Sequence, residues 1–141
     1  MRVRLRNLTL CVAALLLACA PPAAGRGAGD GRAGQTVEVR VGRQVAVAAG
    51  KLKIRFVAVR EDSRCPQGVQ CIWAGNARVR VMLSRAKGRA ATVELNTLTE
   101  PREITYANYT IKLTNLAPRP VQDRQLKASD YVATFVIAKK N

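Results

Sequence analysis

The chain of 141 residues contains no histidine, and aromatic residues make up only 4% of its composition. Without an imidazole, nucleophilic triads of the Ser-His-Asp or Cys-His kind are excluded, and general acid–base catalysis near neutral pH loses its most frequent group. A single Trp and the absence of any run of five basic residues leave no stacking platform and no charge block for nucleic acid. We therefore expect neither a histidine-dependent enzyme nor a nucleic-acid-binding protein.

Acidic residues are also scarce, with nine Asp and Glu in total. Two pairs of carboxylates lie close in sequence, Glu61 with Asp62 and Glu100 with Glu103. A glycosidase needs two carboxylates that face one substrate, but neighbours in a strand point to opposite faces, and the second pair lies in a sequence typical of a solvated turn. Calcium ligation by Asp62 and Asn76 falls short of the usual six to eight oxygen ligands. We expect no catalytic activity, no cofactor and no metal.

No apolar run is long enough to cross a membrane as a helix. Three Arg residues within the first six precede an uncharged run of eleven residues, Leu8–Ala18, whereas a bilayer core of roughly 30 Å needs about twenty. The run ends at Leu16-Leu17-Ala18-Cys19, which is typical of a bacterial lipobox. Residues 1–18 are therefore predicted to be a lipoprotein signal peptide, with Cys19 as the lipidated first residue of the mature protein.

Ordinary cleavage after Ala20 is the alternative, because Ala18-Cys19-Ala20 fits the small-x-small rule of secretory signals. That cut would give a soluble secreted protein, but it places Pro21 just beyond the scissile bond, where proline is usually rejected. In the lipoprotein, Ala20 stands where an Asp commonly retains the protein at the inner membrane. We expect an exported protein that faces the periplasm or the cell surface, on the outer membrane if the cell has one.

Only four cysteines are present. Cys11 leaves with the leader and Cys19 is lipidated or removed, so both cleavage schemes leave Cys65 and Cys71 as a pair. An even count in an oxidising compartment predicts a disulfide, and closing this short loop would stabilise the fold by roughly 2 to 2.5 kcal/mol. The alternative is a two-thiolate metal site, which here lacks the His or further Cys that would complete a tetrahedral zinc shell.

The charge balance is strongly basic, with 24 Lys and Arg and a formal net charge of +15. Removing the leader takes three Arg, so 21 basic residues face nine acidic ones and the mature charge is +12. Such a surface associates with anionic partners, which outside the cytoplasm are lipid head groups, lipopolysaccharide or wall polymers. The alternative is that Arg serves solubility on the outward positions of strands.

The chain divides into a tether and one domain. Ala20–Gly34 consists almost entirely of Ala, Pro, Gly and Arg, so residues 19–34 are predicted to be the lipidated Cys and a flexible tether. The remaining residues, 35–141, have the size of one domain with one core.

The domain shows the alternation of strands. Apolar and charged residues alternate with a period of two, and no window of helical periodicity competes. Seven or eight strands are expected around Val37–Val41, Val45–Val47, Leu52–Phe56, Val79–Leu83, Val93–Leu95, Ile104, Tyr109–Leu113 and Tyr131–Ile137. Turns are expected at Gly42-Arg43, Ala49-Gly50 and Lys87-Gly88. The mixed pattern of the last strand predicts cover on both faces, and the two prolines of Leu116–Pro120 predict an extended surface crossing. The fold class is all-β, a single antiparallel β-sandwich or a barrel-like domain.

One segment departs from this alternation. Asp62–Ala77 contains the cysteine pair, the Trp, Pro66, two further Gly and a charged pair within sixteen residues. It resembles a family of small, uncharacterised bacterial exported proteins and lipoproteins with a DSRCP segment, a second Cys and a CxWxG-like continuation between strands. The resemblance covers these sixteen residues well and the flanking strands loosely, and it implies no catalytic residues.

Each part of this segment has a structural explanation. Pro66 and Gly68 would turn the chain inside the disulfide ring, and Trp73 would lie against the sulfurs or cover the open end of the sandwich. Asp62 would accept hydrogen bonds from the following backbone amides or pair with Arg64. Gly75-Asn76 would permit a positive φ on the way into the next strand.

Functional loops are also commonly displayed on rigid scaffolds, so the same segment is a candidate interaction loop. The residues assigned to that candidate surface are Asp62, Arg64, Pro66, Gln67, Val69, Gln70, Trp73 and Asn76. The predicted function is an anchored binding module that meets an anionic envelope polymer or a protein partner through this loop or its basic strands. The alternatives are a structural accessory protein of the envelope and, as a minor branch, a secreted inhibitor.

Overall fold

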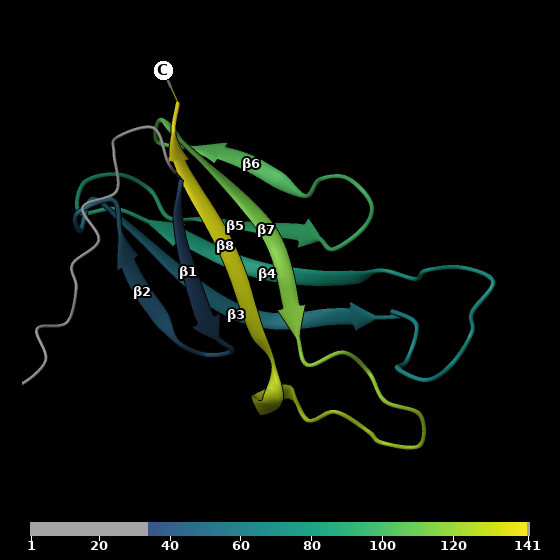
Figure 1. Cartoon of the computed structure of the whole chain (residues 1–141). Helices are drawn as coiled ribbons and strands as arrows, with labels where there is room; N and C mark the ends of the chain where they lie inside the picture. The colour runs from purple at the N-terminus through teal and green to yellow at the C-terminus, as the bar shows by residue number, and fades with distance from the viewer. Residues whose placement is uncertain (1–33, 141) are drawn as a thin grey trace, which may run out of the picture.

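The computed structural model describes residues 34–140, which form eight strands in two four-stranded antiparallel sheets (Figure 1). One sheet has the order β1-β8-β7-β6, and the other has the order β2-β3-β4-β5. The strands are β1 Gln35–Arg40, β2 Gln44–Val47, β3 Leu52–Asp62, β4 Ala77–Ser84, β5 Ala91–Asn96, β6 Glu103–Tyr106, β7 Tyr109–Ala117 and β8 Val132–Lys139, with a short 3-10 turn, η1, at Ala128–Asp130. The predicted signal peptide, Cys19 and the tether up to residue 33 lie outside the described residues.

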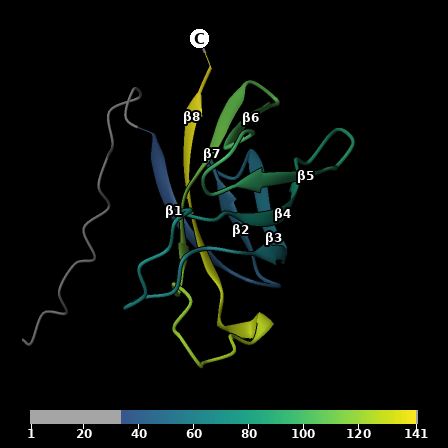
Figure 2. The same ribbon diagram turned by 90° about the vertical axis from the view of Figure 1, so that its right-hand side faces the viewer.

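The predicted alternation is present in the strands. In β4, Ala77, Val79, Val81 and Leu83 are buried, whereas Arg78 and the residues that alternate with it are exposed or half-buried. Side chains of a strand point to opposite faces in turn, so one face of each sheet becomes apolar and can pack on the other sheet. Figure 2 shows the two sheets lying beside each other. They are not closed into a barrel, which confirms the sandwich.

The core lies between the sheets and draws on both of them. Its largest fully buried side chains are Phe56, Phe135, Leu52, Ile54, Leu83, Leu95, Ile111, Leu113 and Leu116. Among residues 34–140, all eight strands and all buried apolar side chains fall within 35–139, and each strand pairs with a neighbour from the same range. Within residues 35–139 the two sheets therefore enclose one apolar core, and every strand is paired.

Two expectations about the last third of the domain were wrong. Leu116 and Ala117 belong to β7, and Leu116 is fully buried, so the surface crossing begins at Pro118. In β8, alternate residues from Ala133 to Ile137 are buried and the others are half-buried, so this strand faces the core on one side only. Its continuous apolar sequence reflects its central position, where β1 and β7 flank it on both edges and shield the outward side chains.

The sandwich has two distinct ends. We call the first the entry end. It contains the start of β1, the end of β8 and the turns β2–β3, β4–β5 and β6–β7. Hydrogen bonds join these segments, from Ala48 N–H to Gln35 Oε1 (2.9 Å) and from Lys140 N–H to the Asn108 carbonyl (2.8 Å). The second, the loop end, contains the connection 63–76 between β3 and β4 together with residues 97–102 and 118–131.

Candidate interaction loop

The connection 63–76, here called the disulfide loop, continues the β3–β4 pairing before it opens out. The Ser63 amide donates to the Asn76 carbonyl (2.8 Å), and the Cys65 amide donates to the Ala74 carbonyl (3.2 Å). Gly75 has a φ of +68°, and a Cβ at this position would lie 1.8 Å from the Ser63 carbonyl oxygen. Only glycine fits here, because it alone combines a positive φ with so close an approach of the two backbones.

The disulfide between Cys65 and Cys71 is formed, as the sequence predicts, with its Cα atoms 6.0 Å apart. Inside the ring, Gly68 has a φ of +79° and the Val69 amide points to the Pro66 carbonyl (3.4 Å), which confirms the predicted turn. The disulfide ring therefore holds residues 66–69 of the loop in a tight turn.

A half-buried ion pair supports the base of the loop. Asp62 accepts hydrogen bonds from the Arg64 amide (3.2 Å) and from Arg64 Nε (2.8 Å) and Nη2 (2.7 Å), and its Oδ2 also accepts one from the Tyr131 hydroxyl (3.0 Å). Arg64 donates further to the carbonyls of Leu116 and Pro118 (2.9 Å to the latter). Only 10% of the Asp62 side chain and 11% of the Arg64 side chain are exposed. These two residues therefore tie the disulfide loop to β7, to the segment after it and to Tyr131, which precedes β8.

Burial and charge act against each other at this cluster. Burial alone would raise the pKa of Asp62, but the hydrogen bonds and positive charge of Arg64 outweigh it and lower that pKa below its ordinary value of 3.8. For Tyr131, burial and the adjacent Asp62 carboxylate raise the pKa to about 12. Near neutral pH the cluster therefore holds an ionised carboxylate, a guanidinium and a neutral phenol that donates its proton.

Asn76 fixes the other side of the loop. Its Nδ2 donates to Asn96 Oδ1 (2.8 Å), and its Oδ1 accepts from the Leu98 amide (3.0 Å) and from Thr97 Oγ1 (3.3 Å). The Ser63 hydroxyl donates to the Asn76 carbonyl (2.9 Å) and accepts from its amide (3.1 Å). The side chain of Asn76 thus joins the disulfide loop to the β5–β6 connection.

A third attachment joins the disulfide ring to the segment after β7. The Gln67 amide donates to the Pro120 carbonyl (2.8 Å), and Gln67 forms an isolated parallel bridge with Val121. The disulfide loop is therefore held by β7, Tyr131, the β5–β6 connection and the 118–121 segment, through contacts at its base and at Gln67.

The tip of the disulfide loop is apolar and exposed. Ile72 is 93% exposed and Trp73 is 82% exposed, and Val69 in the same loop and Val121 in the bridged segment are also exposed. The expectation that Trp73 lies against the sulfurs or covers the open end of the sandwich was wrong, since 82% of its surface is exposed. The contacts that close this end come instead from Arg64 and the backbone of residues 116–120.

The remaining residues of the predicted surface divide into two groups. Gln67, Val69 and Gln70 are exposed together with Trp73, whereas Asp62, Arg64, Pro66 and Asn76 are half-buried and hold the loop. Ile72 was not assigned to the candidate surface, although it is the more exposed of the two tip residues. The sequence did contain a signal for the exposure of Ile72. It is followed directly by Trp73 in a segment without strand alternation, and two adjacent apolar side chains there cannot both be placed on the inward face of a sheet.

The carboxylate pairs considered for catalysis have local partners. Glu61 lies 3.3 Å from Arg78, Glu103 lies 3.8 Å from Lys112, and Glu100 accepts a hydrogen bond from a backbone amide (2.9 Å). Glu103 begins β6, so the predicted turn ends one residue earlier. Within residues 34–140, no three His, Cys, Asp or Glu side chains gather in a group suited to a metal ion. The same range contains no helix long and apolar enough to cross a membrane.

No family model matches the chain, and neither a curated protein nor a solved structure shows detectable similarity to it. The resemblance of Asp62–Ala77 to a family of exported proteins therefore stays a prediction, and functional reasoning depends on the geometry described above.

Proposed function

We propose that this chain is an exported, lipid-anchored protein of the cell envelope whose sandwich presents the disulfide loop as a binding surface for a protein partner. The observation that carries the proposal is the exposed pair Ile72-Trp73 at the tip of a loop that the fold holds in place. Trp is enriched among the residues that dominate binding energy, because one large rigid side chain can fill a pocket of a partner.

The tip contributes little to the fold itself. Its two side chains leave most of their surface in water, whereas the contacts that define the loop come from Asp62, Arg64 and Asn76 beneath it. A loop ordered before binding loses little conformational entropy on association, so the contact area is converted into affinity more efficiently. This arrangement favours a recognition role over the structural accessory role, in which an exposed apolar pair has no use.

Export is supported by two independent features. The N-terminal sequence has the basic start, short apolar run and lipobox of a lipoprotein leader. The Cys65–Cys71 disulfide is of a kind that persists in oxidising compartments and is rare in the cytosol.

The test measures saturable binding of labelled full-length protein to an envelope fraction from its own cells, with unlabelled protein as competitor. The double variant Ile72→Ala, Trp73→Ala is compared with Leu98→Ala, which truncates an exposed apolar residue at the same end of the sandwich. We expect the tip variant to compete at least about thirtyfold more weakly, since loss of a hot spot costs about 2 kcal/mol or more. Leu98→Ala should compete as the unmodified protein does.

Equal competition by the tip variant and the unmodified protein would contradict a binding role for the loop. Binding that does not saturate would contradict a specific partner. Intact mass of the protein from its membrane fraction tests the anchor separately, because a lipidated N-terminus at Cys19 is expected and a soluble form beginning after Ala20 would contradict it.

A further inference from the structure

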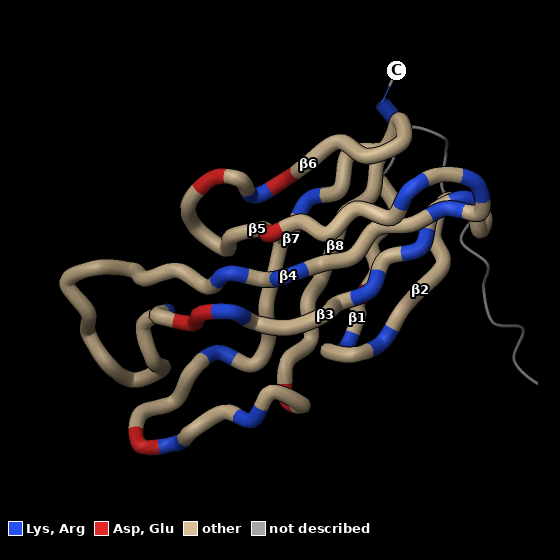
Figure 3. Tube along the Cα trace, turned by 180° about the vertical axis from the view of Figure 1, so that it is seen from behind, with Lys and Arg blue, Asp and Glu red and all other residues tan. Residues whose placement is uncertain are grey.

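The entry end of the sandwich has charges of one sign. Seven exposed basic residues lie on its turns and strand ends: Lys51, Lys53, Arg85, Lys87, Arg89, Lys139 and Lys140. The described segments that form this end, residues 34–36, 47–53, 84–91, 106–110 and 138–140, contain no Asp or Glu. Figure 3 shows Lys and Arg without Asp or Glu along the β2–β3 and β4–β5 turns.

None of these seven residues forms an ion pair within residues 34–140, whereas Arg60, Arg64, Arg78, Arg80 and Lys112 do. Arg60, Arg78 and Arg80 gather around Glu94 on the outer face of β3, β4 and β5, at 4.0, 3.6 and 2.8 Å. The hydrogen bond from Arg80, together with these positive charges, lowers the pKa of Glu94, so that carboxylate stays ionised and neutralises part of the face. Charge that is compensated in the middle of the sheet is left uncompensated at the entry end.

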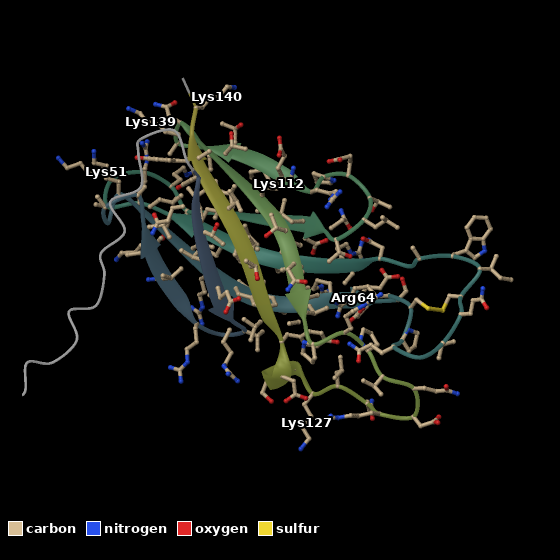
Figure 4. All side chains as sticks on the ribbon, viewed as in Figure 1. Lys51, Arg64, Lys112, Lys127, Lys139 and Lys140 are labelled. Atoms are coloured by element: carbon tan, nitrogen blue, oxygen red, sulfur yellow. A yellow bond between two sulfur atoms is a disulfide. The ribbon has the colours of Figure 1, made fainter. Side chains whose placement is uncertain are left out.

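The opposite end carries most of the acidic residues. Glu61, Asp62, Glu100, Asp123 and Asp130 all lie at or beside the loop end. Figure 4 places Lys51, Lys139 and Lys140 at the entry end and Arg64 and Lys127 toward the loop end. The domain is therefore electrically polar along the direction of its strands.

The same entry end receives the chain from its N-terminal side. Gln35 begins β1 beside Ile137, and its side chain accepts a hydrogen bond from the β2–β3 turn (2.9 Å). Cys19, the predicted lipidated residue, precedes Gln35 by sixteen residues, which can span at most about 55 Å when fully extended. A lipid on Cys19 would therefore connect the domain to the bilayer through its basic end.

We propose that the entry end docks on a bilayer surface rich in anionic phospholipid, with the disulfide loop directed away from the membrane. Clusters of Lys and Arg beside a membrane bind anionic head groups through attraction that falls off within a Debye length. The eleven residues of β3 extend about 36 Å from the entry end to the disulfide loop. If the basic end contacts the membrane, the tip of the disulfide loop therefore lies farther from the head groups than a Debye length. The inference rests on the proposed function for the presence of a bilayer, but not for the identity of the partner.

The first experiment uses residues 35–141, which contain every strand and every buried apolar side chain found among residues 34–140 and which lack Cys19, so binding does not depend on the lipid. Cosedimentation is measured with vesicles of phosphatidylcholine alone and of phosphatidylcholine mixed with phosphatidylglycerol. The variant Lys51→Gln, Lys53→Gln, Lys87→Gln is compared with Arg119→Gln, Arg124→Gln, Lys127→Gln, which removes equal charge from exposed positions at the loop end. Side chains of neither set form an ion pair within residues 34–140, so both variants should fold.

We expect binding only to the anionic vesicles, weaker by about tenfold for the entry-end variant and by less than about twofold for the loop-end variant. Raising the salt concentration from low to physiological should weaken it steeply. Equal loss in both variants, a flat salt response, or binding to soluble dextran sulfate but not to vesicles would each overturn the inference.

The second experiment tests orientation with full-length protein carrying its natural N-terminus. Trp73 is the single Trp of the chain and lies at the loop end, so its fluorescence reports which end touches the membrane. In phosphatidylglycerol vesicles with brominated acyl chains, we expect Trp73 emission to remain unquenched. Quenching would overturn the orientation, and it would do so whether or not the disulfide loop binds a protein partner.

Discussion

The entry end and the loop end of this sandwich are built from the same strands but by different means. The entry end uses short turns whose basic side chains extend into water. None of these side chains has an acidic partner within residues 34–140. The loop end uses an ion pair, an asparagine and a disulfide to hold a long connection against neighbouring segments. The difference shows that local turn chemistry is sufficient for one end, whereas the other depends on contacts between residues distant in sequence. Substitutions at the two ends should therefore differ in cost.

The largest difference is expected between two glycines of positive φ. Gly75→Ala forces a methyl group to within 1.8 Å of a backbone carbonyl, and the loop must move, so we expect unfolding free energy to fall by about 4 kcal/mol. Gly50→Ala, with a φ of +81° at the entry end and nothing within 4 Å, should cost only about 1 kcal/mol. Urea unfolding of the two variants measures the difference, and equal costs would contradict it.

Removal of Arg64 is expected to have the next largest effect. Arg64→Met leaves the Asp62 carboxylate half-buried without its cation and two carbonyls without a donor, so a loss of about 3 kcal/mol is expected. Lys53→Met at the entry end, where no partner is lost among the described residues, should stay within about 0.5 kcal/mol. Comparable midpoints in thermal unfolding would show that the ion pair does not support the loop.

The disulfide should contribute somewhat less than Arg64. Replacing Cys65 and Cys71 together by Ala is expected to lower the free energy of unfolding by roughly 2 to 2.5 kcal/mol, because the unfolded chain regains the conformational freedom that the disulfide removes. Thermal unfolding of the unmodified protein with and without reductant gives an independent value. If reduction leaves the midpoint unchanged, the other attachments of the loop are sufficient without the disulfide.

The burial of Tyr131 and its contact with the Asp62 carboxylate predict a stability loss at high pH. The folded pKa of Tyr131, about 12, lies above its ordinary value of 10.0, so its contribution is complete below pH 10 and is lost as the pH rises from 10 toward 12, by about 2 kcal/mol. For Asp62 the folded pKa is lowered, so its contribution is present above 3.8 and is lost as the pH falls through the folded value.

The comparison with Tyr131→Phe isolates the contribution of the phenol from that of every other group in the protein. We expect the difference in unfolding free energy between the unmodified protein and Tyr131→Phe to shrink above pH 10. A difference that stays constant from pH 8 to 12 would contradict the hydrogen-bonded phenol.

The smallest effect on stability is expected at the tip. Trp73→Ala removes a side chain that is 82% exposed, so the unfolding free energy should change by less than about 0.5 kcal/mol. A substantially larger loss in urea unfolding would mean that Trp73 is part of the fold, and its exposed position would no longer support a recognition role.

Much of the fold was predictable because its strands obey a local rule. The alternation through Leu52, Ile54 and Phe56 and through Val79, Val81 and Leu83 fixed which side chains face inward, and the two sets are buried as expected. Leu116 was misassigned because a following Pro suggests a break, while its burial depends on the opposite sheet. The order β1-β8-β7-β6 pairs segments nearly a hundred residues apart, and no local pattern specifies that pairing.

In the disulfide loop, too, contacts between residues close in sequence were predictable, whereas contacts between distant residues were not. Its turn glycines, the Cys65–Cys71 pairing and the contact of Asp62 with Arg64 involve residues near one another in sequence, so residue type and spacing predicted them. The contacts of Arg64 with the carbonyls of Leu116 and Pro118 cross more than fifty positions, and only the folded chain brings them together. Exposure of Trp73 was decided in the same step, because those contacts close the end of the sandwich that the indole was expected to cover.

By itself, the sequence determined an all-β domain, a disulfide ring and an excess of basic residues, since alternation, cysteine count and charge are properties of the residues alone. Only the tertiary structure decided that uncompensated positive charge gathers at one end and an exposed apolar tip at the other. The physical reason is that position along a strand sets the end at which a side chain lies, and strand pairing sets which distant residues become its neighbours.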